Sequence, residues 1–190
     1  MEGTRSLFEE YPDGFRYEPG FLSVDEETAL AAAIGQIEFS TFEMRGVAAR
    51  RRVAFFGRAY DRTSAVQPIP DFLLPLRRRA AAWSGIDDAA FVMALVNEYP
   101  PGAPIGWHRD APQYDVIAGI SLISPCRMMF RPYVSPGARA TAGRRSATHA
   151  IDLDPRSAYL LAGAARSGYE HHIPPVAAFR YSVTFRSAHR

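Results

Sequence analysis

Two segments in the first half of the chain carry apolar residues at helical spacing. In the first, Ser23 is followed three residues later by Glu26, the arrangement of a capping box, and an alanine-rich run then predicts a helix to about Gly35. The second segment starts after Pro70 and ends at Gly85, with leucines on one face and three arginines on the other. The pattern therefore predicts two amphipathic helices.

Elsewhere the apolar runs are short and are separated by turn residues. Residues 37–61 contain two runs near a basic cluster, Arg50 to Arg52, and predict two strands around an exposed loop. Beyond Gly85 the runs recur about every 8 to 12 residues, which is typical of a sandwich or barrel. We expect strands at residues 91–99, 116–124, 126–134, 149–154, 157–163 and 179–187, and a hairpin tip at residues 135–148.

These elements together predict an α+β fold, in which a barrel or jelly roll of strands is braced by N-terminal helices. The chain has 190 residues, of which 47% are apolar, so we expect a single domain over residues 1–190 with one core. The sequence contains no internal repeat and no composition shift that would mark a domain boundary.

Charge, cysteine content and hydropathy bear on partners and compartment. The net charge is only +2, which says little about partners, and all 22 basic residues are arginine. No apolar run approaches about 18 residues, and the first residues are acidic and polar where a secretion signal needs a basic start. The single cysteine, Cys126, excludes an internal disulfide. We expect a cytoplasmic monomer without membrane contact.

A histidine and a carboxylate two positions apart, His108 and Asp110, precede an apolar run. Sites built from two histidines and one carboxylate bind iron(II) on one face and leave coordination positions open. Residues i and i+2 of a strand point to the same side, so this pair supplies two such ligands if it lies at a strand end. A surface histidine beside a turn aspartate would look the same. The candidates for the third ligand are His149, His171, His172 and His189.

The predicted C-terminal strand has one polar and one apolar face. Its alternating residues are Arg180, Ser182, Thr184 and Arg186 on one side and Tyr181, Val183 and Phe185 on the other. An interior face with two guanidinium groups is costly unless it meets a ligand, and a dicarboxylate would satisfy it by paired hydrogen bonds. The alternative is a surface strand whose arginines lie in water. Asn97 and Tyr99 share one side of their own strand and could donate to the same ligand.

Taken in order along the chain, these motifs resemble the AlkB-like branch of the iron(II)- and 2-oxoglutarate-dependent dioxygenases. The motifs are Asn97-x-Tyr99, His108-x-Asp110, a histidine within HHIPP, and Arg180-x-Ser182-x-Thr184-Phe185-Arg186. The similarity extends to the segments RRVAFFGRAYD and GISLISPCRMMF, and covers roughly residues 15–188. The resemblance implies a double-stranded β-helix, which is a jelly-roll barrel, with iron at its open end.

The resemblance also implies an iron ligand set of His108, Asp110 and His171. His171 is preferred to His172 because an Ile-Pro pair follows it at the family's spacing. The implied cofactors are Fe(II), with 2-oxoglutarate and dioxygen as cosubstrates. Many relatives have tryptophan at the position of Tyr169, which changes the wall beside the metal.

The 2-oxoglutarate site follows from the resemblance in the same way. Arg180 would clamp the distal carboxylate with help from Tyr99 and Ser182. Arg186 and Asn97 would lie near the end that chelates the metal. Some relatives have asparagine in place of Ser182, and a hydroxyl can also hydrogen-bond a carboxylate.

The resemblance implies N-alkylated bases in DNA or RNA as substrates, which are oxidised at the alkyl carbon in single strands or after extrusion from the stack. Arg51, Arg52 and Tyr60 are candidate substrate-binding residues in the segment that corresponds to the family's substrate lid. A solvated loop is the alternative explanation for the arginines. The sequence leaves open the same chemistry on a protein side chain, a small molecule or a modified transfer-RNA base, and a non-catalytic binding barrel.

Overall fold

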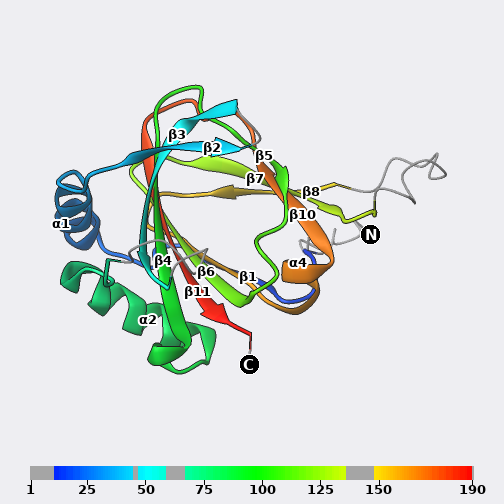
Figure 1. Cartoon of the computed structure of the whole chain (residues 1–190), viewed down its shortest axis with the longest axis horizontal. Coiled ribbons are helices and arrows are strands. Elements are labelled where there is room, and N and C mark those ends of the chain that lie inside the picture. The colour runs from blue at the N-terminus through cyan, green and yellow to red at the C-terminus, as the bar shows by residue number, and fades with distance from the viewer. Residues whose placement is uncertain (1–10, 45–46, 59–66, 136–147, 190) are drawn as a thin grey trace, which may run out of the picture.

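The computed structural model describes residues 11–44, 47–58, 67–135 and 148–189, without the side chains of 42–44, 47 and 48. Two antiparallel sheets face each other (Figure 1). The large sheet has the order β1 (Phe15–Glu18), β9 (Ala158–Leu161), β6 (Tyr114–Leu122), β11 (Arg180–Ala188), β4 (Phe91–Tyr99), β3 (Val47–Gly57) and β2 (Ser40–Met44). The small sheet has the order β5 (Ile105–His108), β10 (Tyr169–Ile173), β7 (Cys126–Pro132) and β8 (His149–Leu153). The architecture is α+β with a jelly-roll barrel, as predicted.

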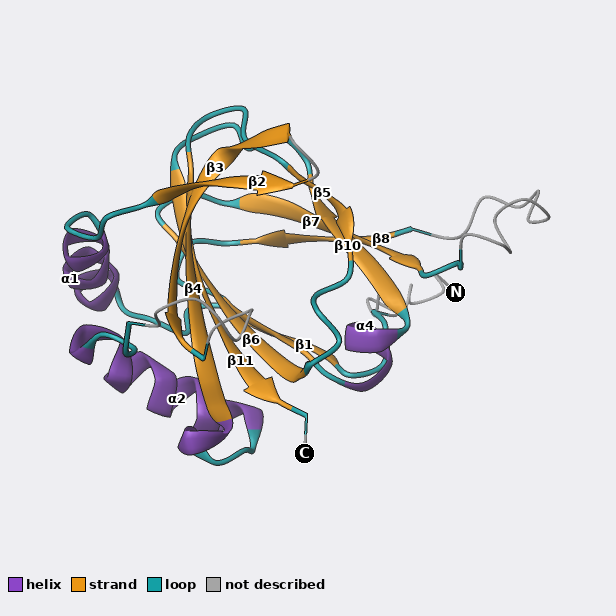
Figure 2. Cartoon of the chain, in the orientation of Figure 1, coloured by secondary structure: helices purple, strands orange, loops and turns teal. Residues whose placement is uncertain are grey.

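The central strand β11 is buried on both faces. Its apolar residues Tyr181, Val183 and Phe185 join a core cluster with residues of α1 (Val24–Ile34) and α2 (Leu74–Ser84), and these two helices lie beside the large sheet (Figure 2). Its polar residues face the interior between the sheets and are also buried. The surface-strand alternative for its arginines is therefore excluded.

The two predicted helices form with the predicted ends. The Ser23 hydroxyl accepts from the Glu26 backbone N–H at 3.2 Å, and the Ser23 N–H donates to the Glu26 carboxylate at 2.8 Å, so the capping box is complete. The second helix begins with a short 3-10 turn, Asp71–Leu73, and ends where Gly85 adopts a left-handed conformation with φ of 75°. No helix in the described ranges is long and apolar enough to span a bilayer.

The structure corrects the interpretation of the basic cluster. β3 runs through Arg50, Arg51 and Arg52 and pairs with both β2 and β4, so that these residues belong to a strand and not to an exposed loop. The short strands β1, β5 and β10 and the helix α4 (Gly163–Ser167) were not among the predicted elements. Most of the predicted hairpin tip, residues 136–147, lies outside the described residues.

Candidate metal and cosubstrate site

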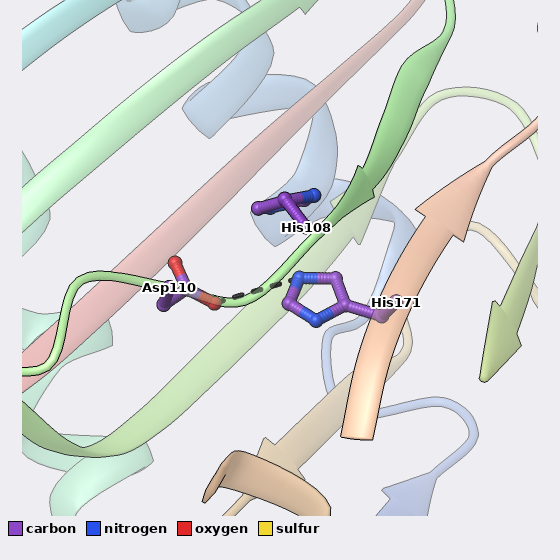
Figure 3. Close-up of side chains that lie close together, drawn as sticks. All are labelled: His108, Asp110 and His171. Carbon is purple, nitrogen blue, oxygen red and sulfur yellow. Dashed lines mark ion pairs between the residues drawn. The ribbon is translucent and has the colours of Figure 1, made fainter. Parts of the chain in front are cut away.

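Three side chains from different parts of the chain meet at the edge of the small sheet (Figure 3). His108 is the last residue of β5, Asp110 follows in the next loop, and His171 lies directly opposite His108 in the β5–β10 ladder. One nitrogen or oxygen atom from each residue lies within 4.8 Å of the others. These three groups could hold one metal ion, and the donor set suits iron(II).

Hydrogen bonds outside this triad fix two of its members. Arg186 of β11 donates from Nη2 and Nε to Oδ1 of Asp110, at 2.8 and 3.2 Å, which leaves Oδ2 facing His171. Nδ1 of His108 lies 2.9 Å from the Gly106 carbonyl. A carbonyl can only accept, so in the neutral ring of His108 this contact places the proton on Nδ1 and the lone pair on Nε2. Both contacts prepare their residues for metal binding.

The charge states of the triad also fit a cation. Burial is the largest single influence and opposes ionisation of Asp110, but the charge of Arg186, the two histidines and the hydrogen bond from Arg186 together outweigh it and hold the pKa of the carboxyl well below its usual range. Burial, followed by the nearby His108, lowers the pKa of His171 to about 3. At neutral pH the ring of His171 is therefore neutral, although its Nε2 lies only 3.4 Å from Oδ2 of Asp110. A cation bound between them would satisfy both atoms.

The structure shows which of the four candidate histidines lies beside His108 and Asp110. Among the described residues only His171 joins His108 and Asp110 in a group that could hold a metal. The ring of His172 leaves β10 on the other side, stacks on Trp107 at 5.0 Å and bonds the Ile105 carbonyl through Nδ1 at 2.5 Å. His149 and His189 are not members of the group.

A buried arginine forms a second cluster deeper in the barrel. Arg180 is 1% exposed, lies 4.7 Å from the ring centre of Tyr99 and donates from Nη2 to the Ser121 hydroxyl at 3.0 Å. Its Nε and Nη1 have no hydrogen-bond partner within the described chain. A buried guanidinium without a counter-charge is strongly unfavourable. The two unused donors therefore fit a carboxylate ligand, which would bind them as a pair.

Ser121 is a member of this cluster that the sequence argument missed. It is fully buried and lies opposite Ser182 in the β6–β11 ladder. The available signal was a lone serine in the otherwise apolar segment GISL, a position where a hydroxyl needs a partner.

A chain of polar contacts links the cluster to β3. Asn97 donates from Nδ2 to the Ser182 hydroxyl at 3.3 Å and accepts from Nη1 of Arg51 at 3.2 Å. Arg51 thus points into the barrel, and burial lowers the pKa of its guanidinium. Arg52 lies on the opposite face, where it pairs with Glu98 at 2.6 Å, so the structure does not bring it to the site. Tyr60 lies outside the described residues.

Comparison with known proteins decides the family. A model of the 2OG-Fe(II) oxygenase superfamily matches residues 14–186. The chain belongs to this superfamily. Residues 14–186 therefore form an iron(II)- and 2-oxoglutarate-dependent oxygenase domain, for which the cofactors are Fe(II), 2-oxoglutarate and dioxygen.

Individual relatives agree with this assignment. The chain is 31% identical to the "Alkylated DNA repair protein ALKBH8 homolog" of Arabidopsis thaliana, over 82% of this chain and 49% of the relative, so it spans about half the length of that protein. The solved structure of OsALKBH1 has a TM-score of 0.66 at 13% identity, over 94% of this chain and 100% of its own. A Pseudomonas putida prolyl-4-hydroxylase has a TM-score of 0.60 at 17% identity, over 93% of each chain. The two solved structures show the fold alone.

Proposed function

We propose that this dioxygenase oxidises alkyl groups on the bases of single-stranded DNA or RNA, so that the oxidised group leaves as an aldehyde. The observation that carries the proposal is the 31% identity to a relative whose name describes repair of alkylated DNA, across 82% of this chain. The fold alone would not select a substrate, because one barrel supports many reactions.

In this proposal His108, Asp110 and His171 bind the iron on one face. When bound, the iron uses dioxygen and 2-oxoglutarate to oxidise a C–H bond of the substrate, with succinate and carbon dioxide as the coproducts. The protein supplies orientation. Arg186 keeps Asp110 ionised and holds its carboxylate in position, and the Gly106 carbonyl fixes the ring of His108.

We assign the cosubstrate to the cluster around Arg180, supported by its two unused donors. Tyr99 and Ser182 belong to this cluster from β4 and β11, and Asn97 and Arg186 lie toward the metal. Burial raises the pKa of Tyr99, so its phenol stays protonated and can donate. All five of these residues are at least nine-tenths buried, so a cosubstrate bound among them would be shielded from bulk water.

Arg51 is the residue that we assign to the substrate. It is half-buried, faces the barrel interior and contacts Asn97, so a positive group stands next to the proposed cosubstrate pocket. A guanidinium there can contact a phosphate or stack on an extruded base. Arg52, on the outer face, has no place in this assignment.

A substrate panel tests the proposal. Iron-loaded protein with 2-oxoglutarate is given single-stranded DNA or RNA that carries N-methylated adenine or cytosine, with the unmodified oligonucleotides as controls. We expect the methylated strands to stimulate succinate release, with formaldehyde formed in step, and to bind less tightly as salt is raised. Arg51→Gln should raise the KM for the oligonucleotide, and Arg52→Gln should not. Stimulation by a peptide or small molecule, and by no nucleic acid, would overturn the proposal.

We also propose that the domain, residues 1–190, works as a monomer in the cytoplasm. The one cysteine is a buried free thiol, which suits a reducing compartment.

A further inference from the structure

Tyr159 of β9 is a buried phenol that none of the assignments above uses. It is 7% exposed and belongs to the same core cluster as Tyr99. Its hydroxyl makes no hydrogen bond within the described chain. Unlike Nε and Nη1 of Arg180, this hydroxyl is not a fully buried atom, and it is available as a donor. It can therefore donate to a ligand.

The strand register places Tyr159 between the two clusters of the proposed site. Tyr159 lies opposite Gly119 of β6, and Gly119 lies opposite Thr184 of β11. Along β11 this row lies between Arg180, which forms the carboxylate pocket, and Arg186, which holds the metal-side carboxylate. Cross-strand neighbours point to the same face of a sheet, so Tyr159 faces the barrel interior, as both arginines do.

Gly119 allows the ring of Tyr159 to lie across the neighbouring strand. A Cβ atom at position 119 would overlap the ring and hydroxyl of Tyr159. The ring thus occupies the space that a side chain at 119 would fill, and the hydroxyl is carried from β9 over β6 toward β11. The pair Gly119 and Tyr159 delivers a donor to the middle of the interior face.

The surroundings of the Tyr159 phenol keep it protonated, so that it can act as a hydrogen-bond donor. Burial, and then the neighbouring Tyr99 and Asp110, raise the pKa of Tyr159, while Arg180 and Arg186 act in the opposite direction. The phenol therefore keeps its proton at neutral pH, and a protonated phenol can donate to a carboxylate oxygen.

We propose that Tyr159 is a further cosubstrate-binding residue, whose hydroxyl donates to the distal carboxylate of 2-oxoglutarate held by Arg180. This carboxylate would then receive donors from Arg180, Tyr99 and Tyr159, which come from three strands of the large sheet. The inference rests on the cosubstrate assignment and is independent of the nucleic-acid substrate.

Tyr159→Phe removes the hydroxyl and keeps the ring over Gly119. Dissociation constants are measured by calorimetry on Mn(II)-loaded protein, with no nucleic acid present, for 2-oxoglutarate and for 2-oxovalerate, in which a methyl group replaces the distal carboxylate. A hydrogen bond to a charged group contributes about 1.5–3 kcal/mol, so 2-oxoglutarate should bind about 10- to 100-fold more weakly. Binding of 2-oxovalerate and the melting temperature of the ligand-free protein should not change.

Tyr17→Phe is the matched control. Tyr17 lies opposite Tyr159 on β1, but its hydroxyl already bonds Asp154. This variant should bind both ligands as the wild type does. The proposal is overturned if Tyr159→Phe binds 2-oxoglutarate normally, or if it weakens both ligands equally. No oligonucleotide is present, so this result can be interpreted even if the proposed nucleic-acid substrate is wrong.

Discussion

At the scale of single residues, His171 and His172 are neighbours in sequence with opposite surroundings. The side chain of His171 is buried beside His108 and Asp110, whereas His172 stacks on Trp107 outside the triad. Their difference follows from the alternation of side chains along a strand. The two residues therefore form a matched pair for testing the proposed metal site.

We expect His171→Ala to lose stoichiometric uptake of Fe(II) in an anaerobic titration. Residues that only orient a ligand change metal affinity by about 10- to 100-fold, so loss of a ligand should weaken binding by more than roughly 100-fold. Succinate formation from 2-oxoglutarate should fall with it. His172→Ala should bind one equivalent of iron and retain turnover, since its ring does not face the ion. Equal loss in both variants would contradict the proposed ligand set.

At the residue scale, the sequence identified the kinds of residue that form the proposed site better than it identified which way their side chains point. His108 and Asp110 were found from their spacing, and the polar face of β11 from its alternation. Arg51 and Arg52 could not be separated in the same way, because the pairing of β3 with β4 decides which of them faces the barrel. Ser121 was missed because its partner, Arg180, lies 59 positions away in the sequence.

At the scale of elements, local signals predicted some boundaries well. The capping box at Ser23 and the left-handed Gly85 act within one turn of their helices, and the boundaries of β4 were predicted fully. β1 and β10 were not predicted, since such short strands are stabilised mainly by neighbours from distant parts of the chain. The alternation of β3 was also hidden, because Arg50 to Arg52 are three consecutive charged residues.

The packing of β6 against β9 depends on Gly119, which has no side chain. Gly119→Ala would force a Cβ into the ring of Tyr159, and overpacking of this kind costs about 1–3 kcal/mol. Urea unfolding should show this loss. In a Tyr159→Leu background the same substitution should cost much less, because the shorter side chain leaves room. Gly106→Ala is the control, since a Cβ there meets nothing within 4 Å. An equal cost in both backgrounds would show that the ring is not the obstacle.

At the scale of the whole molecule, the proposed ligands divide between the two sheets. His108 and His171 belong to the small sheet, and Asp110 follows directly after β5. Arg180 belongs to the large sheet and has no carboxylate partner among the described residues. Arg186 already joins the sheets through its contact with Asp110. A dicarboxylate that binds both Arg180 and the metal would add a second connection.

We therefore expect metal and 2-oxoglutarate to stabilise the fold more together than the sum of their separate effects. A ligand at a hundred times its Kd stabilises by about 2.7 kcal/mol, which for a chain of this size raises the melting temperature by roughly 5–10 °C. Thermal unfolding with Mn(II), with 2-oxoglutarate and with both would measure this coupling, and a chelator should reverse it. Arg180→Met should keep the shift produced by Mn(II) and lose the extra shift from 2-oxoglutarate. Purely additive shifts in the wild type would mean that the cosubstrate does not connect Arg180 to the metal.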